Sequence, residues 1–595
     1  MLANAFVHTA LSRCLGLSTN GLPTVWLAVL AYALFSACTP TPQQPAESAN
    51  APTEATEAPA PQRGGRLVLT MRAEPKTFNP LSAFDNPSLE VLTFLNADLM
   101  RFDPASQRVL PALAESVERS PDGRRYSMRL RDAVLFSDGE SLDAEDVLFT
   151  FLSLLDPALE APQYDSLLID GTPVNIKATG PLDLEFELAN GHAGGESLFD
   201  GVYILPSHRL GALAGQELAQ AWSAGTDPSE IAGAGPFRLR EHRPGERLIL
   251  ERNPHYWQHD DVGTQLPYLD EIVIEFTASP EAEVLRFEAG QSDVVEGLGA
   301  DAFAALERKN GPYTLRDLGP GLVYEFLFFN LNDNVPDAVR QKQAWFRQPA
   351  FRRALSFAID RQAIVDLAYG GRATPVGGHI TPANKLFYDE RVKAPEPSIE
   401  KARALLEEAG FSFRGDQLFD GETAVELTLV TNSSNSRRVQ TATVIQEDLR
   451  RLGVTLHVVP LDFGALLDRV YDSFDYEIGL LGLGRGGFDP NASLNVWLSG
   501  GDSHLWRLDG DGPDSPWQER LDELLGQQMI ELDETRRRAL VSEIQLMIAD
   551  EAPFLFLVAP NVLVGAREGL GHFAPLAAAE TAVWNAERLF WHNPG

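Results

Sequence analysis

Cysteine is almost absent from this sequence: 595 residues contain two, Cys14 and Cys38. The rest of the chain therefore has no thiol that could form a disulfide, act as a nucleophile or bind zinc. Basic residues are also scarce, since 49 Lys and Arg stand against 84 Asp and Glu, for a formal net charge of −35. Binding to polyanions depends on Lys and Arg that displace counterions, so nucleic acid is not expected as a partner.

A long hydrophobic run is missing as well. The apolar stretch from Val25 to Ala37 is shorter than the roughly 20 residues that a membrane-spanning helix needs. Its length suits the apolar region of a signal peptide, and it ends in small residues, as a peptidase site requires. Leu34 to Cys38 resembles the bacterial lipobox, in which the cysteine is lipidated and becomes the mature N-terminus. The resemblance implies a lipoprotein signal peptide over 1–37 and lipidation of Cys38; the alternative is an ordinary signal peptide with a fortuitous cysteine.

Bulky apolar residues are missing from the next segment. Residues 39–62 contain mainly Pro, Ala, Thr, Glu and Gln, with no Leu, Ile, Val or aromatic side chain. Such a segment cannot bury enough apolar surface to offset the entropy lost on ordering. We expect a disordered tether over 38–63 that holds the folded body away from the membrane.

The remaining chain alternates patterns typical of strands and helices. Residues 126–131 alternate apolar and polar side chains with a period of two, and Asp143, with Asp146 three positions later, predicts a capped helix start. The length exceeds the roughly 250 to 300 residues that one core supports, so we expect an α/β protein of two or three lobes. The other expected strands are 66–71, 247–251, 271–276, 425–431 and 454–459, and the other expected helices are 280–290, 351–359, 361–369, 400–410 and 439–452.

Six segments in order resemble one family, the family 5 solute-binding proteins of bacterial ABC importers, which includes peptide, oligopeptide and nickel receptors. The resemblance begins with a strand, an FSDG turn and an AEDV helix start, and continues through most of the body. The six segments are 130–151, 233–257, 328–332, 351–375, 401–411 and 487–501.

The resemblance implies a two-lobed fold of the periplasmic-binding-protein type, of class II and the large kind, with an extra subdomain in the N-terminal half. The lobes of such a receptor close on a ligand between them, and the chain crosses between lobes more than once. The implied boundaries are lobe I at 64–107, 231–325 and 561–595, the extra subdomain at 108–230, and lobe II at 326–560.

The same resemblance implies a function. The protein is expected to be a non-catalytic, monomeric receptor that delivers a peptide-like or oligosaccharide-like solute to the permease subunits of an ABC importer. It is expected at the periplasmic or cell-surface face, held to the membrane by the lipid anchor only, without a cofactor or metal. The alternative is a sensory or chaperone-like binding protein on the same fold.

Three enzyme-like patterns have simpler interpretations. Residues 482–487 satisfy GxGxxG, but Pro490 follows shortly, where a dinucleotide site needs a helix. Ser398 begins an SxxK pattern and is more simply the cap of the helix over 400–410. His255 and His259 have a spacing that could bind a metal on a helix, but Pro254 favours a turn.

The loop after residue 481 is the predicted ligand-binding segment. In peptide-binding relatives an aspartate in this loop pairs with the α-ammonium of the peptide, and Gly486 occupies that position here. A buried ammonium without its carboxylate is costly, so a neutral or anionic solute is expected instead of an ordinary peptide with a free N-terminus. Arg485 offers a planar fork for a carboxylate, a phosphate or hydroxyls, or else is a solvated loop residue. Asp489 could supply a carboxylate, and Phe488 and Trp497 could stack on the ligand.

Overall fold

The computed structural model describes residues 61–484 and 487–593. The predicted signal peptide, tether and lipidated Cys38 lie outside the described residues, as do Arg485 and Gly486. What the sequence predicts for these positions therefore stays a prediction.

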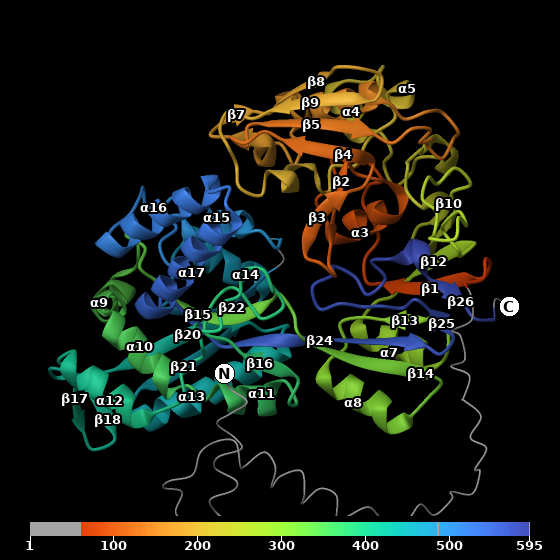
Figure 1. Cartoon of the computed structure of the whole chain (residues 1–595). Helices are drawn as coiled ribbons and strands as arrows, with labels where there is room; N and C mark the ends of the chain where they lie inside the picture. Colours follow the sequence, from red (N-terminus) through yellow and green to blue (C-terminus); the bar gives the residue numbers. More distant parts are fainter. Residues whose placement is uncertain (1–60, 485–486, 594–595) are drawn as a thin grey trace, which may run out of the picture. The chain divides into compact units, whose positions relative to one another are not determined.

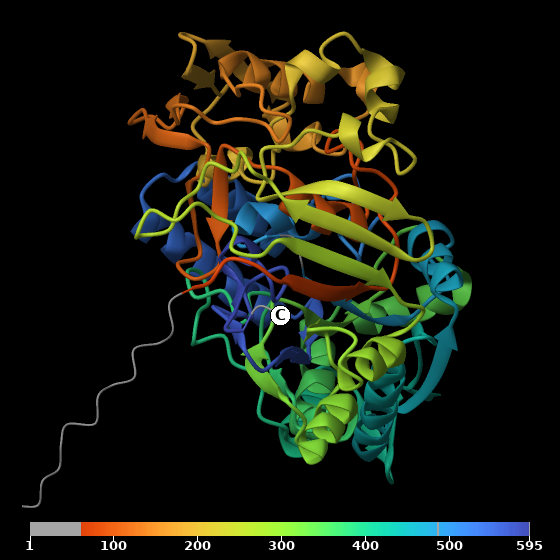
Figure 2. The same cartoon turned by 90° about the vertical axis from the view of Figure 1, so that its right-hand side faces the viewer.

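The first hydrophobic core lies around a four-stranded sheet in the order β1-β12-β11-β10. Figure 2 shows its strands lying side by side. Strand β1 (Arg66–Met71) is parallel to β12 (Glu271–Phe276), whereas β11 (Arg247–Arg252) and β10 (Phe237–Arg243) continue the sheet antiparallel. The apolar runs that predicted β1, β11 and β12 place buried leucine and isoleucine side chains in this core. Strand β1 forms one edge of the sheet.

A second sheet, in the order β4-β5-β9-β8, packs into the same core (Figure 1). In β5 (Arg125–Leu130) every second side chain is buried, as the sequence pattern predicted. Helix α4 (Ala144–Leu154) begins at Asp143 with the predicted capping box, in which Asp146 bonds back to the Asp143 backbone. The other strands of this sheet are β4 (Ala114–Arg119), β8 (Asn175–Ala178) and β9 (Asp183–Glu187).

The second hydrophobic core surrounds a mixed sheet in the order β21-β20-β22-β15-β23. Its three parallel strands are β20 (Glu426–Asn432), β21 (Thr455–Leu461) and β22 (Ile478–Leu483). The two antiparallel strands are β15 (Tyr324–Phe329) and β23 (Phe554–Phe556). The helices of this core include α10 (Pro349–Ala358), α11 (Arg361–Ala368), α12 (Ile399–Glu408), α13 (Ser436–Leu452), α16 (Pro516–Ile530) and α17 (Glu534–Glu551).

Two paired strands carry the chain between the cores. Strand β24 (Val558–Arg567) begins among residues of the second core and ends among those of the first, and Figure 1 shows it reaching from one to the other. It pairs antiparallel with β14 (Tyr313–Pro320), which leads into β15. The predicted lobe boundaries remain a prediction, but the chain does pass between cores at two places, 318–324 and 559–564.

The remaining elements connect these sheets. They are α3 (Asn86–Leu95), β2 (Met100–Asp103), β3 (Arg108–Pro111), β6 (Leu168–Ile169), β7 (Thr172–Pro173), α5 (Ser207–Leu210), α6 (Gly215–Gln220), α7 (Pro280–Glu288), β13 (Val294–Val295), α8 (Ala300–Lys309), α9 (Asp337–Phe346), β16 (Ala373–Pro375), β17 (Ser412–Arg414), β18 (Gln417–Asp420), β19 (Thr423–Ala424), α14 (Phe463–Leu467), α15 (Leu494–Trp497), β25 (Leu570–Gly571) and β26 (Phe590–Trp591).

Candidate functional site

The predicted ligand-binding loop follows β22, at the carboxyl end of the parallel strands of the second core. Open α/β sheets bind ligands at that end, because the loops there diverge. Phe488 connects this loop to β2, since its ring stacks on the ring of Phe102 in that strand, with centroids 4.2 Å apart and planes at 15°. Its carbonyl oxygen accepts a hydrogen bond from the side-chain amide of Asn384 at 2.9 Å. Phe488 therefore packs against protein on one face in this structure.

Asp489 is held by a buried arginine. The guanidinium of Arg537, in α17, donates to both carboxylate oxygens at 2.7 and 2.6 Å. The exposed fractions are 8% for the Arg537 side chain and 19% for that of Asp489. Arg537 also donates to Gln528, so all three nitrogens of its guanidinium are engaged. The carboxylate of Asp489 is thus neutralised within the protein, whereas a ligand ammonium would need a free one.

His192 and Ala193, which follow β9 in the sequence, contact the residues just after the ligand loop. The Asn491 side chain donates to the carbonyl oxygen of Ala193 at 2.9 Å and lies 3.2 Å from Nε2 of His192. Burial lowers the pKa of His192, although the Asp489 carboxylate opposes the shift. Segments of both cores therefore meet around residues 488–491.

Backbone and side-chain contacts both hold this junction. The backbone N–H of Ala193 donates to the carbonyl oxygen of Met529 at 2.7 Å, a contact that needs no particular side chain. The Asn491 contacts do depend on the side chain, because its amide oxygen also accepts a hydrogen bond from Gln528 at 2.7 Å. Asn491 lies in the 3₁₀ helix η6 (Pro490–Ser493), whose cap is the Asp489 carboxylate. The loop is therefore anchored by the residues that follow it.

Trp497 lies in the second hydrophobic core and not on an open surface. Its side chain is 1% exposed and packs against Phe554, with ring centroids 5.2 Å apart, and against Trp506 at 5.9 Å. The ring of His379 lies 4.6 Å from it, and burial lowers the pKa of His379 to about 3. Stacking of Trp497 on a ligand stays a prediction, and in this structure its indole contacts protein.

A group of charged side chains in the first core was not predicted from the sequence. Asp98 and Arg101 flank the start of β2, and Nε of Arg101 donates to the Asp98 carboxylate at 3.2 Å. The other Asp98 oxygen accepts from the backbone N–H of Gly201 at 3.2 Å. Asp200 accepts from the backbone N–H of Phe102 at 2.9 Å, so this group adjoins the residue that stacks on Phe488. We call Asp98, Arg101, Asp200, Tyr203, Tyr256 and Glu587 the β2 cluster.

The β2 cluster is electrostatically unusual. Burial, followed by the Asp98 charge, raises the pKa of Asp200 to about 7. Burial also raises the pKa of Asp98, against the effect of Arg101, and raises the pKa of Glu587. Perturbed acids of this kind gather at functional sites. The sequence could have indicated this cluster only through Asp98 and Arg101, two charges inside an otherwise apolar stretch.

A buried ion pair lies where β20 ends and β15 begins. Nε of Arg438, in α13, donates to the Glu325 carboxylate in β15 at 2.7 Å, and the two side chains are 14% and 6% exposed. A second Arg438 nitrogen lies 3.4 Å from the side-chain oxygen of Asn432, at the end of β20. These contacts fix the carboxyl end of β20 and the start of β15 relative to α13.

The enzyme-like patterns have structural roles. The hydroxyl of Ser398 accepts from the backbone N–H of Lys401 at 3.2 Å, which is the predicted helix cap. The glycine-rich segment after β22 leads into the loop and η6 and not into a long helix. Within residues 61–484 and 487–593, no group of three or more His, Cys, Asp or Glu could hold a metal ion.

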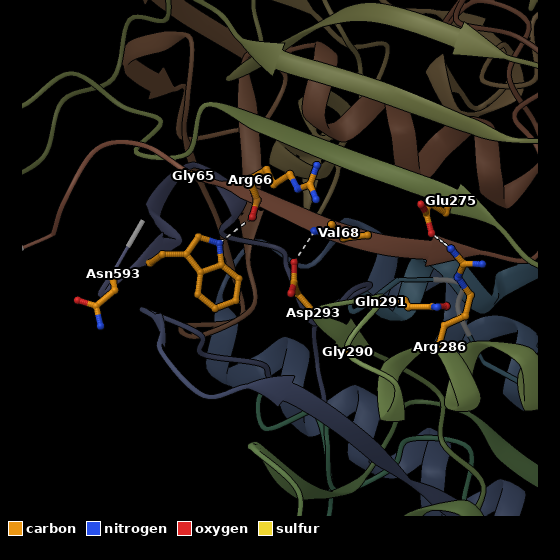
Figure 3. A pocket seen from close by; sticks show the side chains of 10 residues that line it. Gly65, Arg66, Val68, Glu275, Arg286, Gly290, Gln291, Asp293 and Asn593 are labelled. Carbon is orange, nitrogen blue, oxygen red and sulfur yellow. Dashed lines mark hydrogen bonds and ion pairs between the residues drawn. The ribbon is translucent and has the colours of Figure 1, made fainter. Parts of the chain in front are cut away.

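A cavity of about 650 Å³ lies away from these residues, beside the edge strand β1. Figure 3 shows its lining, in which the carboxylate of Asp293 accepts from the backbone N–H of Val68 at 2.7 Å. The Trp591 indole donates to the carbonyl oxygen of Arg66 at 2.7 Å. These two side chains form hydrogen bonds with backbone groups of β1 on its free edge. The contacts protect that edge from pairing with another strand.

None of the helices in the described part of the chain is both long and apolar enough to cross a membrane.

Comparison with known proteins identifies the family. Residues 108–504 match the family described as bacterial extracellular solute-binding proteins, family 5 Middle. A probable ABC transporter-binding protein of Deinococcus radiodurans is 26% identical over 528 residues, covering 84% of this chain and 88% of that protein. The oligopeptide-binding protein AppA of Bacillus subtilis is 26% identical over 526 residues, covering 86% of this chain and 89% of that protein.

A solved structure shows the same fold. The ABC transporter substrate-binding protein CtaP of Listeria monocytogenes superposes with a TM-score of 0.74 at 24% identity, covering 89% of this chain and 100% of that one. The predicted two-lobed α/β fold is thereby confirmed. The relatives are binding proteins of ABC transporters and not enzymes, and the family is extracytoplasmic. With the match covering most of its length, this chain belongs to the family 5 bacterial extracellular solute-binding proteins.

Proposed function

We propose that this protein is a lipid-anchored extracytoplasmic receptor that closes on a peptide-like or oligosaccharide-like solute and delivers it to the permease subunits of an ABC importer. The observation that carries the proposal is the crossing between two hydrophobic cores on the paired strands β14 and β24. Two strands that connect two compact bodies can bend as a hinge while each body keeps its own packing. The lobe boundaries given above, with the extra subdomain at 108–230, form part of this proposal.

The similarity to an oligopeptide-binding protein supports a solute of peptide size. The contacts of Phe488 with Phe102 and of Asn491 with Ala193 bring the predicted ligand loop against the other half of the chain. A ligand held at this junction would contact both halves, so its binding energy would favour the closed arrangement. The receptor then presents to the permease a shape that depends on whether the ligand is bound.

Ligand binding should compact the protein and raise its melting temperature. Peptide and oligosaccharide mixtures are applied to protein freed of bound solute, and native mass spectrometry identifies the solutes retained. The identified solute should reduce the radius of gyration measured by X-ray scattering. It should also raise the melting temperature, because a hundredfold excess over the dissociation constant adds about 2.7 kcal/mol of stability. Tight binding with no change in radius would contradict closure of the lobes.

The lipid anchor is tested separately by Cys38→Ser. Without the thiol no lipid can be attached, so the variant should move from the membrane fraction to the soluble exported fraction. Ligand affinity should not change, because the predicted tether separates the anchor from the folded body. Cys14→Ser is the matched control and should leave the protein at the membrane; retention of the Cys38→Ser variant there would argue against lipidation.

A further inference from the structure

We infer that His192 is a positioning residue for closure, which holds the two halves of the receptor together through Asn491 while its ring is neutral and releases them when the ring is protonated. The inference rests on the proposed receptor function and adds a regulation of the same junction by pH. His192 lies in the segment 191–194, which reads GHAG and which we call the docking segment. This segment lies between β9 and the 3₁₀ helix η3 (Gly195–Phe199), both of which pack into the first core.

The side chains behind Asn491 fix which of its atoms faces the docking segment. Arg537 has donors only, and its guanidinium donates to the side-chain oxygen of Gln528 at 3.1 and 3.2 Å. The amide nitrogen of Gln528 therefore points the other way, and it donates to the side-chain oxygen of Asn491 at 2.7 Å. Gln528 is fully buried, so these two neighbours alone set its orientation.

The amide nitrogen of Asn491 is left to face the docking segment. It donates to the carbonyl oxygen of Ala193 at 2.9 Å, and a carbonyl oxygen only accepts, so this contact requires the same orientation of the amide. Nε2 of His192 lies 3.2 Å from the same nitrogen and must also accept. The docked imidazole is therefore neutral, with its proton on Nδ1. A protonated ring would place two N–H donors against each other and break this contact.

The charges that face His192 come from four places in the fold. Asp489 caps η6, Arg537 lies in α17, Asp170 lies in the turn between β6 and β7, and Glu196 lies in η3. Burial lowers the pKa of His192 and outweighs the three carboxylates, which raise it, while Arg537 acts in the same direction as burial. The docked ring is thus harder to protonate than a histidine in water, whose pKa is about 6.5.

Gly194 shows how closely the two halves approach at this contact. A Cβ atom on this residue would overlap a carboxylate oxygen of Asp489 and lie 2.9 Å from its Cγ and 3.3 Å from a guanidinium nitrogen of Arg537. The carboxylate cannot easily move aside, because Arg537 donates to both of its oxygens and the backbone N–H of Asn491 donates to one of them. The docked arrangement therefore requires glycine at position 194.

These contacts make docking depend on pH. Opening of the halves separates His192 from Asn491 and returns the ring to water. Because the pKa of His192 is lower in the docked form than in the open form, docking releases a proton below about pH 6.5. The docked form therefore has its full stability above about pH 6.5 and loses stability as the pH falls below that value. Affinity for a solute falls with it, since a receptor whose closed form is less populated binds more weakly.

Distances between two spin labels test the inference in the ligand-free protein. Cys14→Ser and Cys38→Ser remove both native thiols from the full-length chain. Labels are then attached through Lys177→Cys in β8 and Glu519→Cys in α16, two exposed positions on either side of the junction. At pH 8 the distance distribution should contain a short, docked population. This population should fall about threefold or more at pH 5.5.

His192→Gln tests whether the pH response belongs to this histidine. Glutamine offers an acceptor to the Asn491 amide but does not titrate, so the docked population should stay nearly constant between the two pH values. Asp200, whose pKa is about 7, and the other groups that titrate in this range remain in the variant, so the difference isolates His192. His259→Gln removes an exposed histidine and is the matched control, which should keep the pH response.

Gly194→Ala should remove the docked population at both pH values, whereas Gly201→Ala should keep it. Both glycines have a φ of +71°, but nothing lies within 4 Å of a Cβ on Gly201, so the control carries the backbone strain without the overlap. The inference would be overturned by a docked population that is absent or does not change with pH, by a pH response undiminished in His192→Gln, or by a docked Gly194→Ala protein. Compaction by a solute would still uphold the receptor function in each case, because closure on a solute does not require this contact.

Discussion

Replacing Arg537 by methionine should lower the free energy of unfolding by about 3 kcal/mol or more, because the substitution leaves the Asp489 carboxylate without its partner. Arg537 is 8% exposed and contacts both oxygens of that carboxylate, so water cannot easily take its place. The loop after β22 should also lose its position, since Asp489 caps η6. Urea unfolding measures the stability, and the affinity for the identified solute reports on the loop.

The double variant Asp489→Leu with Arg537→Met is the control for this prediction. Replacing both members of a buried ion pair by apolar residues is often nearly neutral, so the double variant should recover most of the lost stability. An Arg537→Met protein as stable as the unmodified one would show that Asp489 is solvated and free. In that case Asp489 would be available to anchor a ligand ammonium.

Replacing Trp497 by alanine should cost about 3 to 5 kcal/mol of unfolding free energy, because it leaves a large cavity in the second core. The side chain is 1% exposed and lies among Phe554, Trp506 and His379. Trp497→Phe keeps most of the apolar volume and should cost less than half as much. Urea unfolding of both variants checks the prediction.

The same pair of variants decides between two roles of Trp497. If its indole stacked on the ligand instead, Trp497→Ala would keep its unfolding free energy and lose affinity for the identified solute. If it belongs to the core, the loss of stability comes first, and Trp497→Phe should bind the solute nearly as well as the unmodified protein.

Local sequence patterns predicted local structure well. Asp143 with Asp146, and Ser398 with Lys401, cap helices through hydrogen bonds that span three residues or fewer, so the sequence contains everything those contacts need. The alternation over 126–131 placed the buried face of β5 correctly, since neighbouring side chains on a strand point to opposite faces. The two-lobed fold came from the resemblance of whole segments and not from these patterns.

The environment of the candidate site could not be predicted in the same way. Asp489 looked like a free carboxylate until Arg537, 48 residues away, proved to neutralise it. Trp497 looked available for stacking until the packing of Phe554 and Trp506 enclosed it.

The sequence by itself determined the helix caps, the strand faces and the absence of thiol chemistry from the body. Each of these depends on composition or on residues a few positions apart. Tertiary structure alone decided which charges are paired and which are not. It placed Asp98, Asp200 and Glu587 in one cluster although they are far apart in the chain. The pKa of a carboxyl group depends on the charges and solvent around it, and chain folding sets both.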